Sequence, residues 1–477
     1  MLKDLMASLT TLMGADRITE DAAEMERLSR DATENVPHLP RWKVKVATTE
    51  EVQRVMSWAT QHQVPVTPRV AGMNVGGLAI PAEGGLVLDM AAMNQILKVD
   101  VAQRYALIEP GVTWQQLTDH LKVENLPLRL GYPLAPPDTS IAACCLMDGL
   151  STLSLKYGSM GLWINGLEVV LPTGEKVITG AAAVSDVWFA RGPLPDLTGL
   201  FVNWQGTTGV VTRLAFQLKP MPRYHRRHVI LCGHRDAGFE GMRRLSVSGL
   251  YDEVGGLSWP VAKMAFGVSH PAPRAEGEPD FFLVVDVSAM SQREFALKNA
   301  LLGEEIQGLR RAGFVVEDPV DAEDLVALNP AFVRFARLPT RLDFLLDHPG
   351  QGLTWVGTFG PVDRLEEGGA RGVEILERHG FPAIIVSRPM ASGHYAVLRF
   401  IEVFNRFDPD DVARVTRCQD EVGLALLDLG FVPYKCSPLL WRHVSQRMDP
   451  GARALITRVQ DLLDPAGIMN PGKLGRG

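Results

Sequence analysis

Residues 68–81 read PRVAGMNVGGLAIP, a glycine-bearing segment that starts at the end of a predicted strand, VPVTPRV at residues 64–70. Glycine tolerates positive φ and leaves the backbone open, so successive N–H groups of such a loop can point at an anion. The spacing is neither GxGxxG before a helix nor GxxxxGK[ST], so it predicts neither a Rossmann site nor a P-loop. An ordinary turn remains the alternative interpretation of this segment alone.

Short β-branched runs and helical patterns alternate on both sides of this loop. Residues 48–63 predict a helix with Thr48 or Thr49 as its cap and Glu50 and Glu51 in its first turn. Its predicted buried face consists of Val52, Val55, Met56 and Ala59. Downstream, GLEVVLPTGEKVITG at residues 166–180 predicts a hairpin with a turn at PTG. This first region extends to about Pro220 and is typical of an α+β or α/β unit.

A change of composition at PMPRYHRRH, residues 220–228, predicts a domain boundary near residue 222. Within it, RYHRRH is interpreted as a solvated linker, with His225 and His228 lacking acidic or cysteine companions. Beyond it, three strand patterns and two long helical patterns predict an antiparallel sheet covered by helices. The strands are HVILCGH, FFLVVDV and HYAVLRFIEVF, and the helices begin at Gln292 and Asp410. Residues 271–280 predict a loop.

Length and composition narrow the class of protein. The chain has 477 residues, 46% hydrophobic and 22% charged, so we expect two or three globular domains. A net charge of −7 with scattered basic residues does not favour nucleic acid as a partner. No apolar run reaches 18 residues, so we expect a cytoplasmic protein without a membrane span. The five cysteines form no CxxC pair of the kind that binds a metal. If this protein passes electrons to a metal centre, we therefore expect that centre to belong to a partner protein.

Further motifs follow the loop at ordered distances, and together they resemble the FAD-binding fold of the vanillyl-alcohol oxidase and p-cresol methylhydroxylase family. The motifs are GGLVLDMAAMNQILKVD, ALIEPGVTW, PLAPPDTSIAACC, YGSMGLWINGLEVVLPTGE, LPDLTGLFVNWQGTTGVVTRLAFQLKP and LLDPAGIMNPGKLG. The resemblance covers nearly all of the first region and the last 50 residues. It implies an α+β fold, with a two-subdomain PCMH-type FAD-binding domain and an antiparallel-sheet cap that holds the substrate.

The resemblance also implies a division of the chain and a set of flavin contacts. The expected parts are a helical arm at 1–35, the FAD-binding domain at 36–222, the cap at 223–440 and a C-terminal segment at 441–477 that returns to the FAD domain. The expected cofactor-binding residues are Arg69, Gly72, Met73, Asn74, Gly76, Gly77, Pro137, Asp138, Thr139, Ser140, Ile141, Ala143, Tyr157, Gly158, Gly209, Val210, Thr212, Asn470 and Lys473.

This sequence departs from the family in two places near the flavin. Paired glycines are common after the serine and isoleucine, but Ala142 and Ala143 stand here, followed by Cys144 and Cys145. Alanine is small enough to keep the approach to the flavin open, and we interpret the cysteines as small apolar residues. Covalent flavin is common in the family, yet residues 69–77 contain no histidine, cysteine or tyrosine. We therefore expect noncovalent FAD, with His394, Tyr434 and Cys436 as the alternative anchors.

On the substrate side, residues 392–415 and 429–444 resemble the aryl-alcohol branch of the family. There a Tyr-Arg pair receives a phenolate, and the matching pair here is Tyr434 and Lys435. Lysine keeps the charge but loses the bidentate fork of arginine. His394 is a candidate acid–base group and Arg399 a further candidate, with a core histidine and a structural ion pair as the respective alternatives. The expected catalytic residues are thus Tyr434, Lys435, His394 and Arg399.

The resemblance implies an FAD-dependent dehydrogenase or oxidase that moves hydride from an aryl alcohol or 4-alkylphenol to flavin N5. An external acceptor would take the electrons: oxygen, or a partner such as a cytochrome, an iron–sulfur protein or an electron-transfer flavoprotein. One alternative is a D-2-hydroxy-acid dehydrogenase of the lactate or glycolate type, although its usual histidine-rich metal signature is missing. A second is a non-catalytic flavin-fold subunit of an electron-transfer complex. The protein could form a homodimer or a hetero-oligomer under each of these interpretations.

Overall fold

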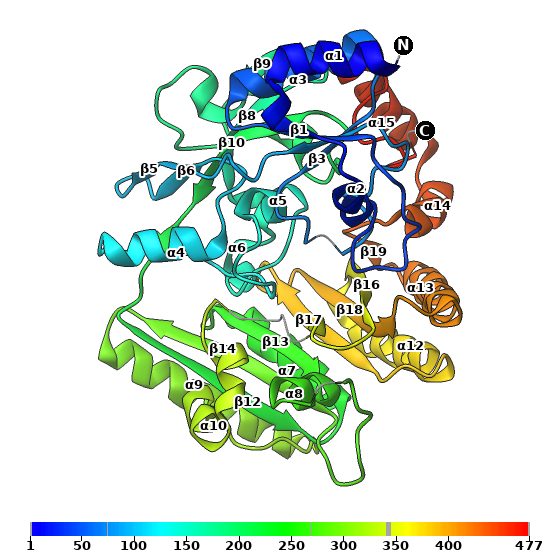
Figure 1. Ribbon diagram of the computed structural model, residues 1–477. Coiled ribbons are helices and arrows are strands. Elements are labelled where there is room, and N and C mark those ends of the chain that lie inside the picture. The colour runs from blue at the N-terminus through cyan, green and yellow to red at the C-terminus, as the bar shows by residue number, and fades with distance from the viewer. Residues whose placement is uncertain (1, 74, 269, 340–344, 476–477) are drawn as a thin grey trace.

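The computed structural model describes residues 2–73, 75–268, 270–339 and 345–475, which form two halves stacked on one another (Figure 1). One half holds the N-terminal 220 residues together with the C-terminus, and the other holds the middle of the chain. The fold is α+β with a sheet-rich cap, as the sequence predicts. No helix in the described ranges is both long enough and apolar enough to cross a bilayer.

The first half contains two larger sheets. In the four-stranded sheet the order is β1 (Ile18–Thr19), β2 (Trp42–Lys45), β4 (Leu86–Asp89), β3 (Val66–Arg69), with β2, β4 and β3 parallel. In the five-stranded antiparallel sheet the order is β5 (Ile96–Asp100), β6 (Tyr105–Ile108), β10 (Val210–Gln217), β8 (Ile164–Val170), β9 (Lys176–Ile178). Strands β7 (Leu128–Arg129) and β11 (Lys219–Pro220) pair separately. The predicted hairpin at residues 166–180 is confirmed as β8 and β9.

Several helices accompany the two sheets of this half. They are α1 (Leu2–Met13), α2 (Ala22–Leu28), α3 (Thr49–His62), α4 (Trp114–Val123), α5 (Ile141–Leu146) and α6 (Ser154–Tyr157). The helix predicted at residues 48–63 is confirmed as α3. The Thr48 hydroxyl accepts a hydrogen bond from the Glu51 N–H, and the predicted face is buried: Val52, Val55, Met56 and Ala59. Local capping and apolar spacing were sufficient to define it.

The C-terminal end of the chain returns to the first half. Helices α14 (Pro438–Arg447) and α15 (Pro450–Leu463) lead back to β3, where Val66 pairs in parallel with Met469. The Val66 N–H donates to the Ile468 carbonyl, and the Asn470 N–H donates to the Val66 carbonyl. The last residues therefore extend the sheet that carries the glycine loop.

The cap is built on one antiparallel sheet of eight strands. Their order is β15 (Val320–Asp321), β12 (Tyr224–Cys232), β14 (Phe281–Ala289), β13 (Glu253–Ser258), β17 (Ile384–Met390), β18 (Tyr395–Asn405), β16 (Gln351–Gly360), β19 (Val432–Pro433). One face packs against α7 (Arg235–Val247), α9 (Gln292–Arg311), α12 (Leu365–Arg378) and α13 (Pro409–Asp428). The other face carries α8 (Trp259–Ala265), α10 (Ala322–Leu328) and α11 (Val333–Ala336) and looks toward the first half. The predicted loop at residues 271–280 is confirmed.

The interpretation of RYHRRH as a solvated linker is wrong. All of these residues except Arg223 belong to β12, and Arg227 is 5% exposed on the inner face of the sheet. Its guanidinium donates to Asp286 at 2.7 and 2.8 Å and to Glu253 at 2.9 Å, while Glu253 also pairs with Arg388. The carboxylates come from β13 and β14, so nothing near RYHRRH in the sequence indicated them.

Candidate active site

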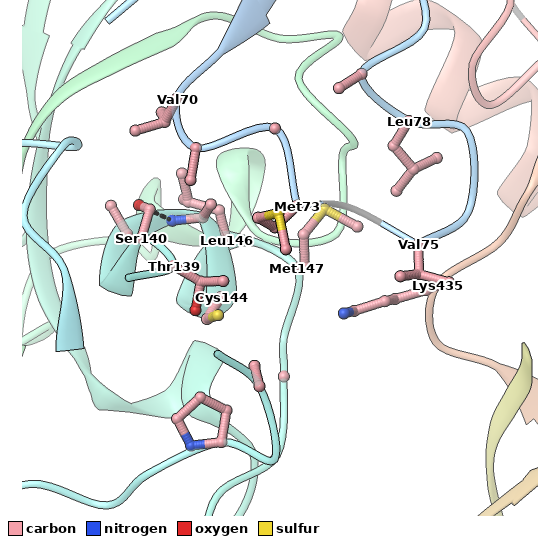
Figure 2. A pocket seen from close by; sticks show the side chains of 18 of the residues that line it. Val70, Met73, Val75, Leu78, Thr139, Ser140, Cys144, Leu146, Met147 and Lys435 are labelled. Atoms are coloured by element: carbon pink, nitrogen blue, oxygen red, sulfur yellow. Dashed lines mark hydrogen bonds between the residues drawn. The ribbon is translucent and has the colours of Figure 1, made fainter. Parts of the chain in front are cut away.

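A cavity of about 280 Å³ lies between the two halves of the molecule (Figure 2). The first half contributes three segments, within residues 68–79, 133–150 and 201–211, together with Met90, Pro110 and Asn470. The cap contributes residues on the inner face of its sheet, including Leu257, Trp355, Val386 and Arg399. Tyr434 and Lys435 close the cap side just after β19. Residues far apart in sequence therefore meet at one site.

The glycine loop begins where β3 ends, at Arg69. Gly72 has φ of 70°, in the left-handed region that glycine adopts without strain, and an added Cβ would collide with the Arg69 guanidinium. Burial, and then the charge of Arg27, lowers the pKa of Arg69. A cation held against an open loop backbone is well suited to a pyrophosphate.

About half of the predicted cofactor residues line the cavity. They are Arg69, Gly72, Met73, Thr139, Ser140, Ala143, Gly209, Val210 and Asn470. Ser140 also caps α5, where its hydroxyl accepts from the Ala143 N–H at 3.0 Å, drawn as a dashed line in Figure 2. The prediction for Asn74 falls on a residue outside the described ranges.

The remaining predicted cofactor residues lie outside the described cavity lining, and their contacts explain why. They are Gly76, Gly77, Pro137, Asp138, Ile141, Tyr157, Gly158, Thr212 and Lys473. The Gly77 N–H donates to the Asp31 carboxylate at 2.8 Å, and the Thr212 hydroxyl donates to Glu168 at 2.9 Å. Tyr157 lies on the surface under Lys219, whose Nζ is 4.2 Å from the centre of the Tyr157 ring.

Pro137, Ile141 and Lys473 have supporting positions instead. The Pro137 carbonyl accepts from the Gln115 N–H at 2.8 Å, and the Ile141 N–H donates to the Val112 carbonyl at 3.1 Å. Lys473 is buried, and burial lowers its pKa to about 8 although the charge of Asp31 opposes this. Such residues shape the loops without facing the cavity.

Two buried side-chain oxygen atoms at the cavity have no hydrogen-bond donor in the described part of the chain. They are the Oε1 atom of Gln205 and the Oδ1 atom of Asn470, and both residues line the cavity. A buried unpaired acceptor is costly, so a ligand that offers N–H or O–H donors fits here. FAD carries such donors together with a pyrophosphate, and the site matches both. Gln205 was not predicted, although it precedes the GTTG segment that indicated Gly209.

The cap side of the cavity holds a cluster of Tyr434, Arg399, Lys435 and Trp355. The Arg399 guanidinium donates to the Tyr434 hydroxyl oxygen. The centre of the Trp355 ring lies 4.8 Å from Arg399 Cζ and 5.5 Å from Lys435 Nζ. In Figure 2 the Lys435 ammonium points into the cavity.

Tyr434 is held rigidly within this cluster. Its ring stacks on Phe359, with centroids 4.8 Å apart and planes 13° apart. Gly357 leaves the necessary space, because a Cβ there would lie 2.8 Å from Tyr434 Cε1. Three of the four expected catalytic residues thus meet at one end of the cavity.

The fourth, His394, requires a correction. It is exposed in the turn between β17 and β18, outside the described cavity lining, and its ring contacts that of Tyr395 at 6.5 Å. Strand β18 begins one residue later, so His394 is neither an active-site group nor the core histidine of the alternative reading. Arg399 differs from its alternative reading too, because its partner is Tyr434 rather than an acid.

Comparisons with known proteins agree with this geometry. Residues 40–180 match the family model described as an FAD binding domain. The chain is 25% identical to the flavoprotein subunit of 4-cresol dehydrogenase (hydroxylating) from Pseudomonas putida, over 97% of this chain and 94% of that one. It is 32% identical to glycolate oxidase subunit GlcD from Bacillus subtilis (strain 168), over 49% of each chain.

Solved structures share the fold over the full length. A crystal structure of p-cresol methylhydroxylase with substrate bound matches 100% of this chain and 97% of that chain, with a TM-score of 0.87 and 21% identity. A 4-ethylphenol oxidase from Gulosibacter chungangensis matches 99% and 97%, with a TM-score of 0.88 and 18% identity. This chain is therefore an FAD-dependent oxidoreductase with the fold of the p-cresol methylhydroxylase family.

Proposed function

We propose that this chain removes a hydride from the benzylic carbon of a 4-alkylphenol or an aryl alcohol. The observation that supports this most is the cluster of Arg399, Tyr434 and Lys435 on the cap side of the cavity. Two cations and a phenol hydroxyl form an environment that stabilises a phenolate. The names of two relatives, 4-cresol dehydrogenase and 4-ethylphenol oxidase, give further support.

In this proposal Tyr434 and Arg399 act as a unit. Because the Tyr434 oxygen accepts from Arg399, its own O–H is left to donate to the substrate oxygen. The side chains of Lys435 and Arg399 then favour the ionised phenol, whose ring electrons assist departure of the para-benzylic hydride. When bound, FAD supplies the hydride acceptor, and the chain's task is to place the donor carbon beside it. Apolar residues such as Leu257, Leu353 and Ile401 keep water from this end.

We also propose that the FAD is held without a covalent bond. Of the three alternative anchors, His394 and Cys436 lie outside the described cavity lining, and the Tyr434 oxygen is hydrogen-bonded to Arg399. Denaturing the purified protein in acid should release all of the flavin into the supernatant. Yellow colour that stays with the precipitated protein would contradict this.

The decisive experiment for the substrate is anaerobic reduction of the bound flavin, followed by its visible absorbance. We expect 4-ethylphenol to bleach the flavin bands, because it offers both the phenol oxygen and the benzylic hydrogen. Mixing the reduced protein with oxygen then tests the acceptor: slow reoxidation would favour a partner protein, such as a cytochrome, iron–sulfur protein or electron-transfer flavoprotein.

A D-2-hydroxy acid is the second candidate substrate. Arg399 and Lys435 would also suit a carboxylate, and glycolate oxidase subunit GlcD is among the relatives. That relative aligns with only about half of the chain, however. Bleaching by D-lactate, with no bleaching by 4-ethylphenol, would establish this candidate in place of the phenol.

A further inference from the structure

The charges around the cavity are unbalanced. Its described lining contains three side-chain cations, Arg69, Arg399 and Lys435, and no carboxylate. Arg69 stands at the glycine loop, where a pyrophosphate can neutralise it. Arg399 and Lys435 stand together at the cap end, within 5.5 Å of the centre of the same Trp355 ring.

Other arginines on the same face of the cap sheet are neutralised within the protein. Arg227 pairs with Asp286 and Glu253, and Arg388 pairs with Glu253. By contrast, the hydrogen bond of Arg399 goes to the neutral Tyr434 hydroxyl. Arg399 is only 6% exposed, and its Nε has no acceptor among the described residues. The two inner arginines away from the cavity therefore have carboxylate partners, whereas Arg399 has none among the described residues.

A buried cation without an anion loses more hydration than an aromatic face returns. Arg399 and Lys435 therefore favour a ligand that brings negative charge to the cap end. A phenolate brings one charge and leaves the second cation without a counterpart. Reduced flavin is the competing source of negative charge, and the experiment below separates the two.

We propose, on the basis of the function proposed above, that the natural substrate is a phenol that also carries a carboxylate. The Tyr434–Arg399 unit holds the phenol oxygen, and Lys435 holds the carboxylate. The recognised chemistry is thus an aromatic hydroxy acid, rather than a neutral alkylphenol.

The test uses the flavin-loaded protein and pairs of ligands that have no benzylic hydrogen, so that binding is measured without reduction. 4-Hydroxybenzoate is compared with 4-hydroxybenzamide, and salicylate with salicylamide, by isothermal titration calorimetry. Each pair differs in charge and hardly in shape. We expect the acid of at least one pair to bind about tenfold more tightly than its amide, as one charge-assisted contact provides. A preference for 4-hydroxybenzoate would place the carboxylate para to the hydroxyl group. A preference for salicylate would place it ortho to the hydroxyl group.

Lys435→Met should abolish this preference, because the affinity for the acid should fall about tenfold relative to the affinity for its amide. Lys219→Met is the matched control, because Lys219 is also a half-buried lysine near a tryptophan, with Nζ 5.1 Å from the Trp163 ring, but lies outside the described cavity lining. It should keep the wild-type preference. Equal affinity for acid and amide in both pairs overturns the proposal, as does an equal loss for both ligands in Lys435→Met, which would assign Lys435 to the phenol or the flavin.

The two proposals can fail separately. Reduction of the flavin by 4-ethylphenol without any preference for acids would leave the phenol oxidoreductase intact and overturn only the carboxylate. Absence of binding by all four ligands, together with no reduction by 4-ethylphenol, would overturn both.

Discussion

At the scale of single residues, Tyr434 shows how the chain fixes one hydroxyl group. Phe359 covers its ring, Gly357 gives it space and Arg399 donates to its oxygen. All of these neighbours lie on β16 or β18, two strands that pair with one another. The hydroxyl therefore has one available direction for its proton, which is toward the cavity.

Removing that hydroxyl should slow hydride transfer. For Tyr434→Phe we expect the rate of flavin reduction by a 4-alkylphenol to fall about 100-fold, as for the loss of one preorganised donor. Rapid-mixing absorbance under anaerobic conditions measures this rate. Tyr395→Phe is the control, because Tyr395 belongs to the same aromatic cluster but lies outside the described cavity lining. An unchanged rate in Tyr434→Phe would remove this hydroxyl from the mechanism.

The space at Gly357 gives an independent test of the same side chain. In Gly357→Ala the new Cβ would press on the Tyr434 ring. We therefore expect reduction of the flavin to slow at least tenfold, which corresponds to an increase of about 1.4 kcal/mol in the activation barrier. Gly303→Ala, in α9 with open space around it, should leave the rate unchanged and slightly stabilise the helix. Equal rates in Gly357→Ala and the wild type would show that the position of Tyr434 is not critical.

The sequence identified Tyr434 and Lys435 because they form part of a contiguous motif. It included Arg399 among the candidates but did not reveal its hydrogen-bond partner, which lies 35 residues further along the chain. It misjudged His394, which the sequence places at the start of a strand. In the structure β18 begins at Tyr395, and His394 is exposed in the preceding turn. Pairing across a sheet decides such roles, and one sequence does not reveal it.

At the scale of secondary-structure elements, β12 differs most from its prediction. Its basic run reads as a linker because five of the six residues in RYHRRH are arginine or histidine. Pairing with β14 along nine residues places Arg227 opposite Asp286, and this long-range contact makes burial possible. Helix α3 and the β8–β9 hairpin were predictable since their caps and turns are local.

The buried ion network gives a prediction for this element. Arg227→Met leaves Asp286 and Glu253 without their shared cation, so we expect the free energy of unfolding to fall by about 3–5 kcal/mol. Urea denaturation followed by circular dichroism measures it. Arg226→Met, on the same strand but 47% exposed and paired with Asp321, should cost less than about 1 kcal/mol. Similar losses in both variants would show that burial does not control the effect.

At the scale of the whole molecule, Asp252 connects the two halves. This buried carboxylate of the cap is 2.8 Å from Arg129 and 2.5 Å from Lys156, both of which belong to the first half. Burial alone would raise the pKa of Asp252, but the charges of Arg129 and Lys156 outweigh it, and the pKa is lowered. The ionised form is therefore favoured in the folded protein, and it helps to hold the cavity walls in place.

The pH dependence follows from this direction. A lowered pKa contributes stability that is present above the ordinary value of 3.8 and is lost as the pH falls below it. At pH 7 we expect Asp252→Asn to lower the free energy of unfolding by about 2 kcal/mol, with the difference shrinking below pH 4. Asp196→Asn, at an exposed ion pair with Arg191, should change it by less than about 0.5 kcal/mol. A difference that grows in acid would contradict the assignment.

The order of the chain has a consequence for how the protein is made. Asn470 contacts Leu78 and Gln205 through its side chain, yet the whole cap is synthesised between Gln205 and Asn470. Domains generally begin to fold during translation, from the N-terminus onward. The glycine loop therefore lacks its contact with Asn470 until the segment around Asn470 has emerged from the ribosome. Flavin loading would then follow synthesis of the segment around Asn470, which comes after the whole cap.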